Sequence, residues 1–150
     1  MLHLPLLRAG IPYHSLRQNT LRHVTTGDEV ALLSQANQGM ISRDRRDGPS
    51  HQKRLAELAV TDLVSICQEA AKLFSQASLP LYPGADQHQL ADDYVAQLSS
   101  TTGLPHTLCR ANMEKIHRVL SQIDEIVDGL TRCMDPAIID AGWDPYFDRL

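Results

Sequence analysis

Two stretches of the chain place apolar residues at the i, i+3, i+4, i+7 spacing that puts them on one face of a helix. The first begins after Thr61, which we expect to cap it because a threonine hydroxyl accepts an orphan backbone N–H. Its apolar face consists of Leu63, Ile66, Cys67, Ala70, Leu73, Phe74 and Ala77. The second begins at Pro105, a residue suited to a first helical position, and its apolar face consists of Leu108, Ile116, Val119, Leu120, Ile123, Val127 and Leu130. We predict two long helices with these faces in the core.

Shorter helices are expected between and after these two. Residues 40–46 should form one, ended by Gly48-Pro49, because the residue before a proline is disfavoured in a helix. Asp86 is the expected cap of another, which leads into a polar loop at residues 99–105. On the long second helix, Glu114 and Arg118 are spaced for an i, i+4 ion pair. The further short helices are predicted at residues 53–58 and 137–141.

The first 34 residues are expected to form strands and turns rather than helices. Pro5, Gly10 and Pro12 favour an extended arm over residues 1–19. Two short runs rich in Leu, Val and Thr then flank Gly27, which predicts a β-hairpin over residues 20–34 with no third strand beside it. The predicted fold class is mainly α, with an extended arm at 1–19 and a single mostly helical domain at 20–150 that starts with this hairpin.

Some apolar residues have no evident place in that domain, and these are our interface candidates. The arm carries several of them with little of its own chain to fold on, and exposed apolar patches often mark partner surfaces. Trp143 is the sole tryptophan and suits an interface anchor as well as it suits a cap on the core. We therefore predict a homo-oligomer or an obligate complex. The arm's interface candidates are Leu6, Leu7, Ile11 and Tyr13.

Composition narrows the class of protein. Hydrophobic residues make up 43% of the chain and charged residues 21%, values at which a chain folds. The net charge of −4 comes with no basic tail, so we expect neither nucleic acid nor a membrane surface as partner. No stretch reaches the roughly 20 apolar residues of a membrane helix. The three cysteines form no C-x-x-C pair, which favours a soluble protein of the reducing cytoplasm.

No complete catalytic or metal motif is present: the chain lacks phosphate loops, G-x-G-x-x-G, H-E-x-x-H and G-x-S-x-G. Cys109 follows His106 near a helix start, where the dipole favours a thiolate, but we interpret it as a small buried residue because no acid partner or oxyanion donor is evident. His106 and His117 are three turns apart, too far for one metal ion. The alternating charges of residues 43–47 indicate a solvated face. We assign no catalytic, cofactor-binding or metal residue.

The order of elements nevertheless resembles a known family. Residues 25–34, with their T-G turn, acidic residue and apolar strand, residues 52–74, with their pair of helices, and residues 94–115, with helix, T-G-x-P loop and helix, are similar to the N-terminal region of the aldehyde dehydrogenase superfamily. Residues 96–105 and 109–116 look like a bacterial subgroup of uncharacterised aldehyde dehydrogenase-like proteins.

The resemblance implies a scaffold role. In that family the cofactor-binding strands, the general-base glutamate and the nucleophilic cysteine lie beyond the matching region, and none of Cys67, Cys109 or Cys133 takes the nucleophile's place. The implied function is an N-terminal scaffold segment of a truncated or split dehydrogenase-like oxidoreductase, inactive alone. NAD or NADP is implied only for an intact relative, and the remaining dehydrogenase polypeptide is the implied partner. The alternatives are a free-standing helical protein-interaction module and, third, a small thiol or metal enzyme using Cys109 and His106.

Overall fold

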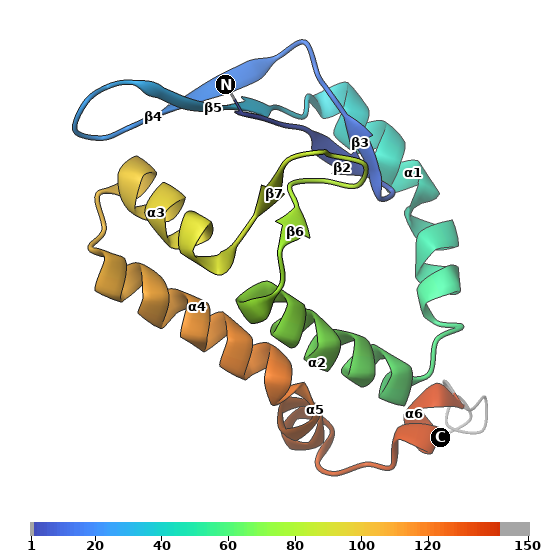
Figure 1. Ribbon diagram of the computed structural model, residues 1–150. Coiled ribbons are helices and arrows are strands. Elements are labelled where there is room, and N and C mark those ends of the chain that lie inside the picture. The colour runs from blue at the N-terminus through green and yellow to red at the C-terminus, as the bar shows by residue number, and fades with distance from the viewer. Residues whose placement is uncertain (1, 142–150) are drawn as a thin grey trace.

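A computed structural model describes residues 2–141, in which six helices and seven short strands form an open arch (Figure 1). The mainly helical class with strands at the N-terminus is confirmed. The strands are β1 (Leu2–Leu4), β2 (Leu6–Arg8), β3 (Ile11–Tyr13), β4 (Gln18–Arg22), β5 (Glu29–Ser34), β6 (Leu79–Pro80) and β7 (His88–Gln89). The helices are α1 (Gln38–Leu55), α2 (Val60–Gln76), α3 (Ala91–Thr102), α4 (His106–Ser121), α5 (Ile123–Thr131) and α6 (Pro136–Asp140).

The predicted hairpin exists as the antiparallel pair β4 and β5, with Gly27 at a φ of 77° in its turn. The expectation that it lacks a third strand is wrong. β1 pairs in parallel with β5, with Leu2 opposite Ala31 and Leu4 opposite Leu33, so the sheet order is β1, β5, β4. Strand β1 therefore forms hydrogen bonds with the edge of β5 that β4 does not occupy. The outer edges of β1 and β4 have no strand partner in residues 2–141.

The rest of the predicted arm is extended, as expected, but it is paired. β2 and β3 form a second hairpin, whose turn contains Gly10 at a φ of 82°. Two buried serines attach this segment to the three-stranded sheet: Ser15 N donates to Ser34 Oγ at 3.2 Å, and Gln35 N donates to Ser15 Oγ at 2.9 Å. The division of the chain at residue 19 stays a prediction.

One helix replaces the two short helices predicted over residues 40–58. α1 is continuous from Gln38 to Leu55 and contains Pro49, so the predicted break at Gly48-Pro49 is wrong. Asn37 Oδ1 accepts from Met40 N at 2.8 Å and caps the start. A proline inside a helix removes one hydrogen bond and costs about 3 kcal/mol. Because α1 has no buried residue, the carbonyl that loses its donor is not shut away from solvent.

Helix α2 begins at Val60 rather than behind a cap at Thr61, and the cap comes from a distant element. Val60 N donates to Asp140 Oδ1 of α6 at 2.9 Å, across 80 positions of sequence. A local reading of the sequence cannot find such a partner. Asp135 caps α6 itself by accepting from Ala137 N at 2.9 Å, in agreement with the predicted last helical turn.

The helix predicted from Pro105 to Leu130 is divided. Gln122, with φ −106° and ψ 28°, separates α4 from α5. Pro105 is the residue before α4 rather than its first residue. The predicted polar loop is shorter than expected, because α3 continues to Thr102 and ends at Gly103 with a φ of 76°.

The predicted cap of α3 at Asp86 is wrong too. Residues 88–89 form β7, and α3 starts only at Ala91. Asp93 Oδ2 accepts from Leu90 N at 2.9 Å and supplies the carboxylate at this helix start. An aspartate does accept a backbone N–H at this helix start, but it is Asp93 rather than the predicted Asp86.

The core lies where α2, α3 and α4 meet, and it is small. Buried Val95, Cys109 and Met113 pack with the partly buried residues Phe74, Ala91, Tyr94 and Leu98. Much of the predicted core is exposed instead: Ile66 by 56%, Leu108 by 55% and Leu130 by 81%. The periodicity correctly predicted that these helices are amphipathic. It did not show which residues of each apolar face contact a neighbouring helix and which remain exposed.

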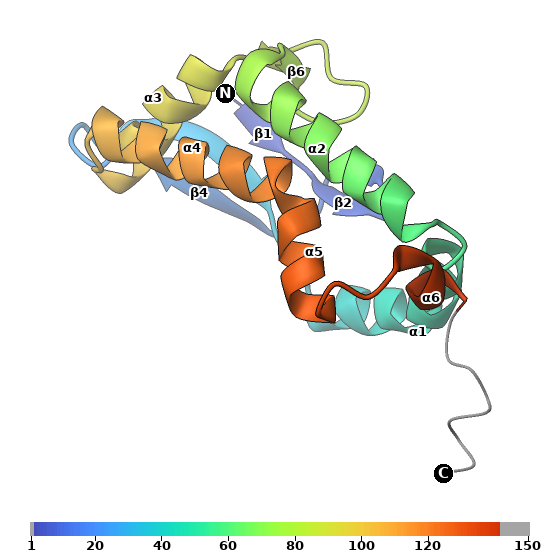
Figure 2. The same ribbon diagram turned by 90° about the horizontal axis from the view of Figure 1, so that it is seen from below.

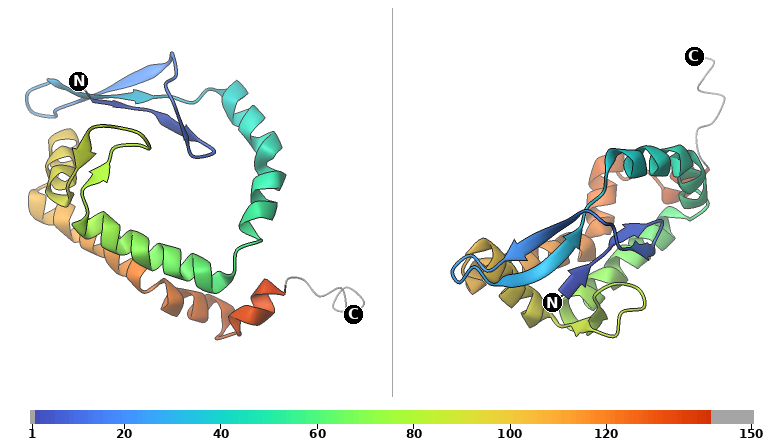
Figure 3. Two further views of the ribbon diagram at one scale, coloured as in Figure 1. Left: turned by 45° about the vertical axis from the view of Figure 1, so that its right-hand side comes forward. Right: turned by 90° about the horizontal axis from the view of Figure 1, so that it is seen from above.

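The elements enclose an arch, with α1 on one side and α3 and α4 on the other (Figures 1 and 3). Seen from below, α2 and α4 lie side by side, followed by α5 and α6 (Figure 2). Contacts between the N-terminal strands and the later part of the chain include a backbone hydrogen bond and a group of aromatic rings. Val24 N donates to Ser100 O at 2.9 Å, and the His14 ring lies between those of His3 and Tyr82, with centroid distances of 4.4 and 5.9 Å.

None of the helices in residues 2–141 combines the length and the apolar character required to cross a membrane.

Candidate functional site

The predicted interface residues gather at the β2–β3 hairpin. Leu7 is 58% exposed, Ile11 69% and Tyr13 42%, whereas Leu6 is half-buried. Trp143 lies outside the described residues. The hairpin and α1 together line a groove of 520 Å³, so three of the five predicted residues share one surface.

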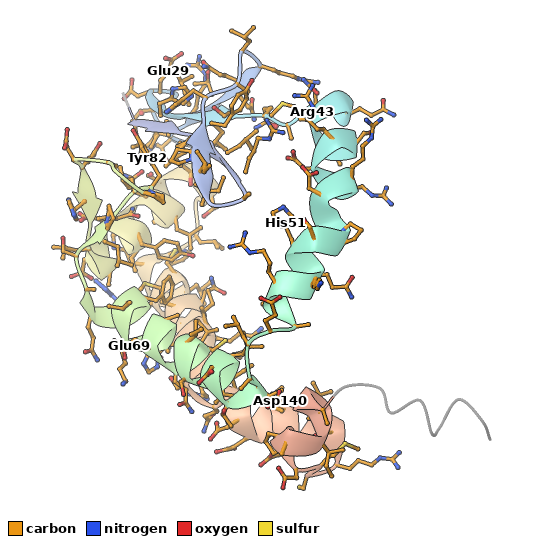
Figure 4. The ribbon with its side chains drawn as sticks, turned by 90° about the vertical axis from the view of Figure 1, so that its right-hand side faces the viewer. Glu29, Arg43, His51, Glu69, Tyr82 and Asp140 are labelled. Atoms are coloured by element: carbon orange, nitrogen blue, oxygen red, sulfur yellow. The ribbon has the colours of Figure 1, made fainter. Side chains whose placement is uncertain are left out.

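A charged contact joins this hairpin to α1. Arg8 Nε donates to Asp44 Oδ2 at 3.0 Å, a second guanidinium nitrogen donates to Oδ1, and the guanidinium carbon lies 5.3 Å from the centre of the Tyr13 ring. The hydrogen bond from Arg8 holds the pKa of the Asp44 carboxyl below its ordinary value and raises the pKa of Arg8. His51, further along α1, points toward the inside of the arch (Figure 4). Asp44 therefore has a specific partner, whereas the sequence indicated only a solvated face for residues 43–47.

A larger groove, of 720 Å³, lies between α2, α3 and α4. Its apolar part is formed by Ala91, Val95 and Met113, of which Val95 is 1% exposed and Met113 8%. These residues belong to the core, so the groove is built on the best packed part of the described chain. Figure 4 shows the opposite situation at α1, whose side chains project with no second helix against them.

The polar part of this groove comes mostly from α4. Arg110, Glu114, His117 and Arg118 are spaced to lie on one side of the helix, and all four line the groove. Arg110 donates to Asp92 of α3 at 2.7 Å, which ties the two helices together at the groove. The expected pair between Glu114 and Arg118 is not formed, so neither group has an ion-pair partner among residues 2–141.

His117 is half-buried in the wall of the groove. Its Nδ1 lies 3.4 Å from Ser121 Oγ, one turn further along α4. Ser121 O in turn accepts from Gln68 of α2 at 3.4 Å. The Ser121 hydroxyl also donates to His117 O, at 2.5 Å, so its contact with the imidazole is the weaker of the two. The imidazole Nε2 has no hydrogen-bond partner in the part of the chain that the structure describes.

The sulfur and imidazole groups that the sequence singled out do not converge. Cys109 is fully buried in the core, with Sγ 3.7 Å from Leu104 O, which agrees with its interpretation as a packing residue. His106 is exposed, Cys67 half-buried and Cys133 exposed. Within residues 2–141 no three His, Cys, Asp or Glu side chains are placed to hold a metal ion.

Sequence reasoning missed the groove, although part of its signal was present. The spacing of Arg110, Glu114 and Arg118 along one helix face is visible in the sequence. The partners from α2 and α3 are not, because they depend on how the three helices pack.

Comparison with protein-family models, curated proteins and solved structures found no match to this chain. The fold and the two grooves therefore define the molecule only as a mainly helical protein with N-terminal strands, a small core and a large exposed apolar surface.

Proposed function

We propose that this chain is a scaffold segment, comparable to the N-terminal region of an aldehyde dehydrogenase-like oxidoreductase, that completes its fold against another polypeptide. The observation that carries the proposal is the balance of apolar residues. Among residues 2–141, five apolar residues are buried, while eighteen large apolar residues are exposed. Apolar residues that gather into an exposed patch are typical of surfaces that a partner covers.

Half of these exposed residues lie on helices, and some of them have the spacing of a core-facing helix face. Ile66 and Leu73, two turns apart on α2, are 56% and 44% exposed. Leu130 of α5 and Ile138 of α6 are 81% and 60% exposed. Burial of apolar surface stabilises by about 25 cal/mol per Å², so covering these faces would add substantially to a fold with a small core.

The dehydrogenase part of the proposal rests on the resemblance of residues 25–34, 52–74 and 94–115. Oxidation of an aldehyde needs a thiolate nucleophile, an oxyanion donor, a base and a bound nicotinamide. In an assembled enzyme the partner polypeptide supplies these groups and binds NAD or NADP, while this chain supplies helices and strands. We place the assembly in the cytoplasm, where free thiols persist, and we infer that a second copy of the chain or the dehydrogenase polypeptide is the partner.

Light scattering after size exclusion tests the association. We expect at least twice the monomer mass, and we expect the double variant Leu130→Asp, Ile138→Asp to lower that mass because a charge opposes burial. The matched control is Leu16→Asp, which changes a fully exposed leucine of the loop between β3 and β4. A monomer at all concentrations would contradict the association.

Capture from the native cell, followed by an assay, tests the dehydrogenase assignment. The chain alone should not reduce NAD or NADP with an aldehyde, whereas the captured complex should. Activity of the isolated chain that Cys109→Ala abolishes would support the thiol enzyme instead. A captured partner that binds no nicotinamide would favour the alternative function.

That alternative is a free-standing helical protein-interaction module, and the β2–β3 hairpin is the observation that favours it. Leu7, Ile11 and Tyr13 project from the hairpin beside the 520 Å³ groove. Aromatic and aliphatic residues in such a position suit the central contacts of an interface. Replacing Ile11 by Asp should then remove the partner, while the Leu130 and Ile138 changes should have less effect.

A further inference from the structure

The groove between α2, α3 and α4 differs from the exposed helix faces, because it is concave and lies on packed residues. Its volume of 720 Å³ falls in the range of small-molecule sites. Its apolar surface comes from the half-buried Ala91 and from the edge of Met113, which is 8% exposed, and both residues pack on the buried Val95. A site on packed helices keeps its geometry better than a site on loops.

The charges around the groove indicate the class of ligand. Asp92 already neutralises Arg110 at 2.7 Å. Arg118 has no carboxylate partner in residues 2–141, and the adjacent His117 has a free Nε2. Glu114 lies on the same side of α4 and repels a second negative charge. Glu114 also lacks an ion-pair partner in residues 2–141, so the lining as a whole carries no net charge. An anionic group is favoured only at the end of the groove where Arg118 and His117 lie next to each other, and the ligand that suits this arrangement has one negative charge and an apolar body.

We propose that this groove binds a medium-chain monocarboxylate, with the carboxylate on Arg118 and His117 and the acyl chain across Ala91 and Met113. Arg110 and Arg118 are eight residues apart on α4, which is about 12 Å along the axis. The chain can therefore extend from Arg118 toward the Asp92–Arg110 pair. The proposal goes beyond the scaffold role and does not depend on it.

Methyl NMR tests the proposal with decanoate as the probe. The chain has four methionines, and Met113 lines the groove, while Met40 belongs to α1 and Met134 follows α5. In protein labelled with ¹³C at the methionine methyl groups, decanoate should shift the Met113 signal in a saturable way. Met40 and Met134 serve as internal controls and should not shift over the same concentrations.

Variants of exposed residues separate the charged contact from general apolar binding. Arg118→Gln should weaken decanoate binding about tenfold, the scale of a hydrogen bond to a charged group. Glu114→Gln should strengthen it, because it removes a repulsive charge. Arg45→Gln, which changes an exposed arginine of α1, is the matched control and should have no effect. Decyltrimethylammonium, with the same tail and the opposite charge, should bind more weakly and should not lose affinity in Arg118→Gln.

Two results would overturn the proposal. One is a Met113 signal that decanoate does not shift, whether or not the Met134 signal shifts. The other is equal affinity of Arg118→Gln and Arg45→Gln for decanoate. Either result leaves the scaffold proposal intact, because association is measured by mass and not by this ligand.

Discussion

Helices α1 and α4 have similar lengths, 18 and 16 residues, but opposite surroundings. α4 buries Cys109 and Met113 against α2 and α3, whereas α1 buries nothing. A helix that is polar all round depends on its caps and side-chain propensities, while an amphipathic helix is held by packing. Two segments can therefore both be helical and still differ widely in how much packing against neighbouring elements stabilises them.

The largest expected effect comes from the packed region. Val95→Asp should place an unpaired charge in the core and should cost more than about 4 kcal/mol of the free energy of unfolding. Val119→Asp changes the same residue type at a position of α4 that is 43% exposed, and it should cost less than about 1 kcal/mol. Urea unfolding followed by circular dichroism measures both. Equal losses would show that α4 is not packed as described.

Helix α1 should respond differently, because its stability is local. Pro49→Ala restores a hydrogen bond and should stabilise α1 by up to about 3 kcal/mol. Since α1 has no buried residue, the urea midpoint of the whole protein should hardly move. Hydrogen exchange should instead slow at the α1 amides alone, and Gln52→Ala on the same helix should leave it nearly unchanged. A large rise of the global midpoint would mean that α1 is coupled to the core.

The same contrast explains which features the sequence could predict. The hairpin at residues 20–34 and the mainly helical class follow from turn chemistry and periodicity, which are local. The packing role of Cys109 follows from the lack of an acid partner or oxyanion donor in the sequence. The strand β1 beside β5, the Asp140 cap on α2 and the wall of the larger groove depend on residues far apart in sequence. The helix break predicted at Pro49 is wrong for another reason. The sequence shows that proline opposes a helix, but not that the helix lies in water, where the penalty is tolerated.

The third prediction concerns the first residue of α2, which lies between α1 and the packed helices and donates to Asp140 of α6. Asp140→Ala removes the carboxylate that accepts from Val60 N, and loss of such a cap costs about 1 kcal/mol. Figure 4 shows Asp140 where α6 meets this end of α2. Asp128→Ala, at an exposed position of α5, is the control. If both variants lose the same stability in urea, the cap across 80 residues contributes nothing.

The smallest effect is expected at the contact between α1 and the β2–β3 hairpin. The hydrogen bond from Arg8 lowers the pKa of Asp44, so the contact stabilises the folded chain above the ordinary aspartate pKa of about 3.9. That contribution should disappear as the pH falls through the lowered pKa of Asp44 in the folded chain. Arg8 is partly and Asp44 largely exposed to water, so the effect is small and salt reduces it. In Arg8→Gln, carboxyl NMR should report a higher pKa for Asp44, and the two proteins should become equally stable in acid. An Asp44 pKa that Arg8→Gln leaves unchanged would show that the ion pair does not hold α1 to the hairpin in solution.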